Sequence, residues 1–195
     1  FVDGQEAEAY GRVKPFLTLT MEKYLLHLEA DIRADTMHDA EGIFDNPSDA
    51  SALQRSVDMR ELYFEYLDNK YFARFGQQVF DLSLLDSVSP SDIISPRDWS
   101  HLVDNEKRGQ FAFNFKVGDT NFVQAIYVPW FKPSVIPDSD NLWSRDVPLG
   151  LSLQNERYSR DEGDQILLRL GTSLLDSDFV LSYFNGNSYS QMYNL

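Results

Sequence analysis

The chain has 195 residues, with 31 acidic and 17 basic side chains and a formal net charge of −14. This excess of negative charge argues against nucleic acid as a partner, because phosphate contacts require clusters of Lys and Arg. The absence of cysteine excludes disulfides, thiolate metal sites and cysteine nucleophiles, and no apolar run reaches the roughly 18 residues of a membrane helix.

The first predicted strands lie between Phe16 and Asp35. Residues 16–20 alternate between apolar and polar side chains, 22–23 make a turn, and a longer alternation runs from Leu26 to Asp35. A strand turns successive side chains to opposite faces, so this longer segment separates an apolar face from a charged one. Its length is about that of a tilted strand that crosses a bilayer, and its mixed charges suit a water-filled lumen. The pattern makes a transmembrane β-barrel a candidate.

Further alternating segments follow, most of them in pairs around a turn. The pairs are residues 58–67 and 71–79 around Asp68-Asn69, 111–117 and 123–127 around 118–121, and 147–156 and 165–170 around a turn near 159–163. A last strand is predicted at 178–184. The chain is therefore predicted to be all-β, with about nine meandering antiparallel strands.

Short and long connections alternate along the chain. The long polar segments cover residues 36–56, 80–109 and 129–146. Outer-membrane barrels have this asymmetry, with short periplasmic turns and long external loops. Only the connection near 175–177 is short where a long one is expected.

The odd number of strands has a consequence for the domain organisation. Bacterial single-chain barrels normally close with an even number of strands, because an open edge in lipid leaves backbone groups unpaired. We therefore expect residues 1–195 to form one incomplete barrel segment, with residues 1–14 as an N-terminal lead-in. The rest of the barrel, or another subunit, would close the sheet.

Several segments resemble motifs of a poorly characterised family of Gram-negative outer-membrane porin-like barrels. These are Glu61-Leu62-Tyr63-Phe64, Gly76-Gln77-Gln78-Val79, Asp92-Ile93-Ile94-Ser95-Pro96-Arg97-Asp98, and Val128-Pro129-Trp130-Phe131-Lys132-Pro133 with the later Trp143. The similarity covers about residues 15–145. The chain departs from the family at Gln77, often Arg, at Asp81-Leu82, often Trp-Gly, and at Ser95, usually Asn. The resemblance implies the N-terminal portion of a larger barrel in the bacterial outer membrane.

Charged residues on the polar faces of the predicted strands are candidates for the wall of a channel. We expect the loop of residues 81–104 to fold into the lumen as a constriction that selects solutes by size and charge; an ordinary cluster of turn residues is the alternative. For the wall itself, the alternative is the solvated face of a soluble sheet. The predicted pore-lining and constriction residues are Glu29, Asp31, Arg33, Glu61, Glu65, Arg74, Asp92, Arg97 and Asp98, and His27, Lys116 and Arg169 lie on the same predicted face.

Nothing in the sequence favours catalysis. There are three histidines, and neither a Gly-x-Ser-x-Gly elbow nor a His-Glu-x-x-His motif occurs. The acidic turn at 161–164 lacks the full spacing of a calcium loop. We predict no enzyme activity, no cofactor and no metal site.

The predicted function is that of an outer-membrane porin-like channel for passive or facilitated passage of small solutes, in contact with outer-membrane lipid and lipopolysaccharide. A soluble secreted β-sandwich, jelly-roll-like and carbohydrate-binding, is the alternative. The two differ in one set of apolar side chains, which stay exposed in a barrel segment and are buried against a second sheet in a sandwich. These side chains are Leu62, Phe64, Phe75, Phe111, Phe113 and Phe115.

Overall fold

The computed structural model describes residues 10–35, 56–82, 94–98, 106–132, 134, 163–175 and 177–187. In these residues every regular element is a strand and every strand pairing is antiparallel. The fold is therefore all-β, as the alternation predicted. No helix in the described part of the chain is long and apolar enough to cross a membrane.

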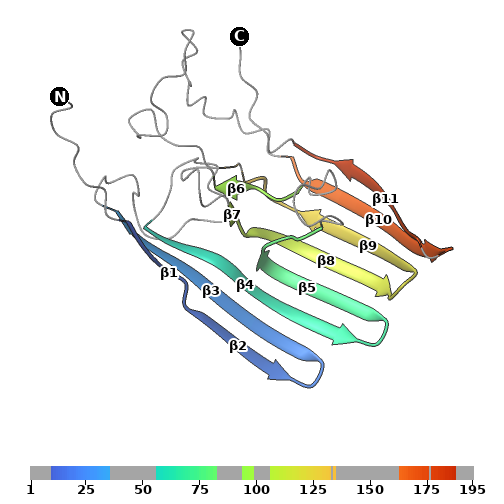
Figure 1. Cartoon of the computed structure of the whole chain (residues 1–195), viewed down its shortest axis with the longest axis horizontal. Coiled ribbons are helices and arrows are strands. Elements are labelled where there is room, and N and C mark those ends of the chain that lie inside the picture. Colours follow the sequence, from blue (N-terminus) through green and yellow to red (C-terminus); the bar gives the residue numbers. More distant parts are fainter. Residues whose placement is uncertain are drawn as a thin grey trace, which may run out of the picture.

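One large sheet dominates the structure (Figure 1). Its nine strands follow the order β1-β3-β4-β5-β8-β9-β10-β11, with β2 also paired to β3, and β6 and β7 form a separate two-stranded sheet. The bounds are β1 Tyr10–Val13, β2 Phe16–Met21, β3 Tyr24–Asp35, β4 Val57–Asp68, β5 Tyr71–Gln78, β6 Arg97–Asp98, β7 Glu106–Lys107, β8 Gln110–Gly118, β9 Phe122–Val128, β10 Gln165–Leu174 and β11 Ser177–Asn185.

The first edge of the sheet is one strand in two parts. β1 pairs Val13 with Ile32 and β2 pairs Phe16 with Glu29, so both parts keep the same register along β3. Pro15 interrupts the strand where it lacks a backbone N–H, which an edge strand tolerates. Residues 10–13, which we predicted to belong to the N-terminal lead-in, are thus part of the sheet.

Four tight turns lie together at one end of the sheet, on the right of Figure 1. They join β2 to β3, β4 to β5, β8 to β9 and β10 to β11. Glu22, Gly118 and Leu175 adopt positive φ in these turns, and the Asp68 carboxylate accepts a hydrogen bond from the Asn69 N–H at 2.9 Å. Short polar side chains that bind the following backbone are typical of such turns.

The predicted hairpin of residues 147–156 with 165–170 is wrong. β10 pairs with β9 along one edge and with β11 along the other, so neither of its edges is left for a further strand. Residues 147–156 themselves lie outside the described residues. With this correction the short connection before Ser177 becomes the fourth tight turn, and tight turns and long connections alternate strictly.

The outer face of the sheet, as we name the face that carries Phe64 and Phe113, is apolar and exposed. Phe113 and Phe115 are 47% and 49% exposed, and the Phe75 and Phe113 rings lie 4.7 Å apart between neighbouring strands. Leu62, Phe64 and Phe75 are exposed as well. Phe111 differs, since Trp130 and Phe75 pack around it and leave it half-buried. The expected exposure is confirmed for the other five side chains.

The opposite face, which we call the inner face, is polar and largely covered. Its buried polar side chains include Gln110, Asn114, Gln124, Gln165 and Arg169. A small apolar core covers part of this face, where Phe80, Leu82 and Ile94 pack on Ala112, Ile126, Val128 and Leu167. The described segments that follow β5 therefore lie against the inner face.

The sheet is not closed into a barrel. β1 and β2 form one edge and β11 forms the other, and no pairing joins these edges in the residues described. β1 and β2, the two parts of the edge strand, both pair with β3, and each of the other strands pairs with the strands directly before and after it in the large sheet. The observed architecture is an open antiparallel meander with one apolar and one polar face.

Candidate functional site

A network of charges joins the inner face of the sheet to β6 and β7. Asp31 accepts hydrogen bonds from Arg12 Nε at 2.8 Å and from Arg33 Nη2 at 2.7 Å. Arg33 in turn donates to the Asp98 carboxylate of β6, and Arg12 reaches Glu106 of β7 at 3.1 Å. We call these five residues the loop–wall network. It brings together three of the predicted pore-lining residues and joins β6 and β7 to the sheet.

The other two predicted loop residues are Arg97 and Asp92. The Arg97 backbone N–H donates to Ser134 Oγ at 3.0 Å, and Arg97 pairs with Lys107 in the small sheet. Asp92 lies outside the described residues.

A bulge in β4 shapes the centre of the inner face. The register of β3 and β4 shifts between Glu29 and Ala30, and Arg60 is the extra residue. Its side chain therefore reaches the inner face, although strict alternation would place it with Leu62 on the outer face. There Arg60 Nη1 donates to Glu29 Oε1 at 2.6 Å.

Beside this pair, His27 lies between two glutamates. His27 Nε2 is 3.9 Å from Glu29 Oε2 and 3.7 Å from Glu61 Oε2, and Thr18 Oγ1 binds the other ring nitrogen at 2.8 Å. Glu61 Oε1 accepts the backbone N–H of Val79 at 2.9 Å. This trio can act chemically in two ways. A protonated imidazole would interact with both carboxylates, whereas a neutral imidazole together with the two carboxylates would offer three ligand atoms to a cation.

Glu65 and Arg74 form the next ion pair along the inner face. The two residues are directly opposite each other in β4 and β5, and Arg74 Nε donates to Glu65 Oε2 at 2.8 Å. The guanidinium also lies over the Tyr63 ring, 4.1 Å from its centroid. Arg33 differs from Arg74, since it binds Asp31 of its own strand and Asp98 of β6.

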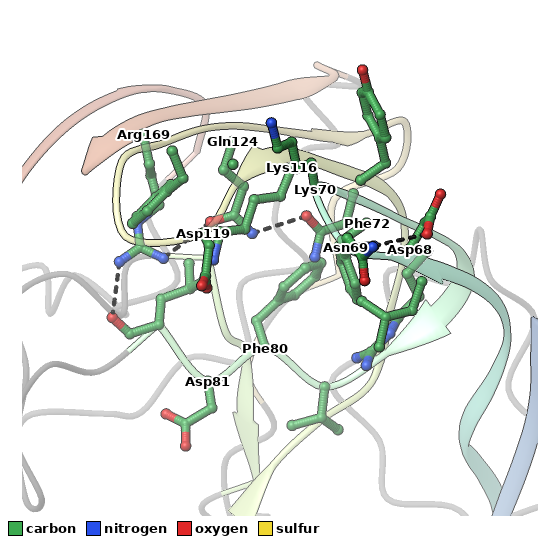
Figure 2. Close-up of a pocket in the computed structure, with 18 residues that line it drawn as sticks. Asp68, Asn69, Lys70, Phe72, Phe80, Asp81, Lys116, Asp119, Gln124 and Arg169 are labelled. Atoms are coloured by element: carbon green, nitrogen blue, oxygen red, sulfur yellow. Dashed lines mark hydrogen bonds between the residues drawn. The ribbon is translucent and has the colours of Figure 1, made fainter. Parts of the chain in front are cut away.

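A cavity of about 410 Å³ lies between the inner face and the segment after β5 (Figure 2). Arg169 lines it, donating to Gln124 Oε1 at 3.2 Å and to the Leu82 carbonyl oxygen at 3.5 Å. Gln124 donates to Asn114 Oδ1 at 2.9 Å. The other labelled lining residues in Figure 2 come from the turn ends of the strands and from the segment after β5: Asp68, Asn69, Lys70, Phe72, Phe80, Asp81, Lys116 and Asp119.

Sequence reasoning placed Lys116 and Arg169 on the wall but did not identify this cavity. Its floor follows from the strand alternation, which puts Asn114, Gln124 and Arg169 on one face. Its other side depends on where Phe80 and Leu82 lie, and both continue the chain beyond the last residue of β5. The sequence marked this region by the family-like motif at 76–79 and by the loop of residues 81–104 that was predicted to fold into the lumen, but neither indicated a cavity here.

The turn end of the sheet carries aromatic and paired charged residues. Lys23 Nζ lies 3.1 Å from Asp68 Oδ2, and this hydrogen bond raises the pKa of the exposed Lys23 ammonium. Tyr24 and Tyr66 have ring centroids 5.4 Å apart, and Tyr71 is exposed.

Comparison with known proteins adds no relative. No protein-family model, no curated protein and no solved structure matches this chain. The resemblance to outer-membrane porin-like barrels therefore stays a prediction based on the motifs quoted above.

Proposed function

We propose that this chain is part of an outer-membrane β-barrel channel, through which small solutes pass along the inner face of the sheet. The observation that carries the proposal is the opposite character of the two faces. Exposed Phe and Leu side chains line the outer face, whereas carboxylates, guanidinium groups and amides line the inner face. A soluble protein places its apolar face inside, and a membrane barrel places it toward lipid.

Strand length and turn placement support the same proposal. β3 and β4 each have 12 residues, which corresponds to roughly 40 Å at about 3.3 Å per residue. Tilted by about 45°, such strands cover the roughly 25–30 Å apolar layer of a bilayer. All described tight turns lie at one end, as the periplasmic turns of such barrels do.

The charge pairs of the inner face suit the wall of a solute path. Three described pairs there, Arg33–Asp98, Arg60–Glu29 and Arg74–Glu65, hold ions of both signs in fixed positions. Fixed charges of both signs in a narrow lumen select solutes by size and field. In this proposal the lipid-facing partner is the outer-membrane bilayer with its lipopolysaccharide, and the two free sheet edges are closed by further strands of the barrel or by another subunit.

The experiment that tests the proposal is reconstitution of the full chain in planar lipid bilayers. We expect discrete ion conductance, together with a requirement for detergent or lipid to keep the protein in solution. A chain that dissolves as a compact monomer in detergent-free buffer and conducts no ions would contradict the proposal. The soluble sandwich, in which the outer face is buried, predicts that second result.

A further inference from the structure

Arg169, which lines the cavity of Figure 2, is a buried cation with no acidic partner among the residues that the structure describes. Arg169 is 7% exposed, and its two hydrogen-bond acceptors, Gln124 and the Leu82 carbonyl, are both neutral. Its Nε atom is buried and has no hydrogen-bond partner within the described residues. Arg33 and Arg74, in contrast, each bind a carboxylate. Because a buried charge is unfavourable unless it is paired, Arg169 presents an unused site for an anion.

A second cation lines the same cavity. Lys116 Nζ lies 4.4 Å from the centroid of the Phe122 ring, and no ion pair joins Lys116 to the acidic groups that the structure describes. Of the acidic lining residues, Asp68 binds Lys23 and Asp81 binds Lys107, while Asp119 is exposed in the turn after β8. The cavity is thus locally cationic in a chain of net charge −14.

The remaining walls are partly aromatic. Phe72, Phe80 and Phe122 line the cavity, and Phe80 is almost fully buried. A volume of about 410 Å³ lies within the range of small-molecule sites, and here the aromatic rings lie among a larger number of polar and charged side chains. Such a site fits a molecule with an anionic end and an apolar body.

We infer that this cavity binds a small organic carboxylate, with Arg169 and Lys116 as counter-ions and Phe72, Phe80 and Phe122 against its apolar part. The guanidinium provides N–H donors for the carboxylate, and charge-assisted hydrogen bonds of this kind are the stronger ones. The inference rests on the proposed function only for the role of the bound molecule, which would be a solute of the channel. Binding itself is measurable without transport.

The test is calorimetric titration of the full chain in detergent micelles with benzoate, with the neutral isostere benzamide and with acetate, which lacks the ring. We expect one benzoate per chain, bound about tenfold or more tightly than benzamide or acetate, since charge-assisted hydrogen bonds are the stronger ones. Arg169→Gln weakens benzoate binding about tenfold or more. The control Lys14→Gln, which removes a cation that binds Glu106 on the same face outside the cavity, leaves it unchanged.

Equal affinity for benzoate and benzamide, or unchanged benzoate binding in Arg169→Gln, would overturn the inference. If Arg169→Gln does not fold, Lys116→Gln decides in its place, and undiminished benzoate affinity in that variant refutes the site. Conductance separates this inference from the channel. If the chain binds benzoate but conducts no ions, the carboxylate site stands and the proposed channel is wrong. If the chain conducts ions but shows no preference for benzoate, the channel stands and the carboxylate site is wrong.

Discussion

At the scale of single residues, Asp31 is the centre of the loop–wall network. Asp31 is 2% exposed, and its carboxylate lies between two guanidinium groups, from Arg12 and Arg33. Without this carboxylate two cations would remain close together in a buried place. The attraction in such a buried cluster depends on every member, so the loss of one acid leaves uncompensated charge.

We therefore expect Asp31→Ala to lower the free energy of unfolding by about 3–5 kcal/mol. Urea denaturation of the chain in detergent, followed by circular dichroism, measures this loss. The matched control is Asp119→Ala in an exposed turn, with an expected change within about 0.5 kcal/mol. Equal effects of the two substitutions would contradict the role given to Asp31.

Gly76 is a second residue on which the local structure depends. It has φ of 127° and lies opposite Tyr63 in the pairing of β4 with β5. A Cβ there would collide with the Leu62 carbonyl oxygen and lie 2.9 Å from Tyr63 Cα. The glycine of the family-like segment at 76–79 thus has a physical reason in this fold, since L side chains avoid this backbone conformation.

For Gly76→Ala we expect destabilisation of about 1–3 kcal/mol, because both the φ angle and the contact are unfavourable. Gly11→Ala serves as the control, since a Cβ at Gly11 meets, among the described residues, only the Ala34 carbonyl oxygen at 3.9 Å. The midpoints of thermal unfolding of the two variants, measured side by side, check the difference. A midpoint for Gly76→Ala equal to that for Gly11→Ala would show that the strand relaxes around the new methyl group.

At the scale of elements, β6 and β7 each take part in an ion pair, and the two pairs lie in different environments. Asp98 binds Arg33 with both side chains nearly buried, whereas Asp81 binds Lys107 with its own side chain 78% exposed. Exposed ion pairs contribute little to stability, and buried ones contribute much more when one partner is removed. Asp98 therefore attaches β6 to the sheet more strongly than Asp81 attaches β7.

Limited trypsin digestion tests this difference, since Arg97 and Lys107 are cleavage points in β6 and β7. We expect Asp98→Ala to accelerate cleavage at these residues about tenfold or more, in line with about 1.4 kcal/mol per tenfold change in local opening. Asp81→Ala should change the rate less than about threefold. Cleavage in both variants at the wild-type rate would mean that Asp98 does not hold β6 in place.

The strands were predictable from the sequence to the extent that their alternation was regular. The longest ones, β3 and β4, stand out because apolar and polar residues alternate over many positions, and their hairpin partners follow from the tight turns. The bulge at Arg60 was not predictable, because a single extra residue in β4 changes faces without a compositional signal. β6 and β7 have two residues each, too few for any periodicity.

Strand partners and the cavity depended on contacts between distant residues. Residues 147–156 carry an alternating pattern, but alternation alone does not show with which strand a segment pairs. β9 occupies the edge of β10 at which this segment was predicted to pair. The network of Arg12, Asp31 and Glu106 joins residues far apart in the sequence, so only their common polar face could be anticipated. The proposed carboxylate site could not be predicted from the sequence, because its cavity depends also on where Phe80 and Leu82 lie.

At the scale of the whole molecule, the exposed outer face gives a direct test of the surroundings of the protein. Phe113 lies in the middle of β8, beside Phe75 and Tyr127 of the neighbouring strands. A lysine there would face acyl chains in the proposed barrel and water in a soluble protein. The same substitution is therefore costly in one environment and tolerated in the other.

We expect Phe113→Lys to destabilise the chain in lipid vesicles by about 2–4 kcal/mol, the cost of a lysine near the middle of a bilayer. Thr120→Lys in the exposed turn after β8 provides the control, with an expected change near zero. Equilibrium urea unfolding from vesicles of one lipid composition gives both values. Unaltered stability of Phe113→Lys in vesicles would place this face outside the bilayer.

The order of the strands also bears on how the sheet forms. Apart from β1, which pairs with β3, every strand of the large sheet pairs with the next strand of that sheet along the chain. The sheet therefore contains four successive hairpins, each closed by a tight turn. Local pairing of this kind shortens the loops that must be closed before contacts stabilise the chain. Growth can therefore advance one hairpin at a time from β2–β3 toward β10–β11, and after each addition the newest strand offers its free backbone groups to the next.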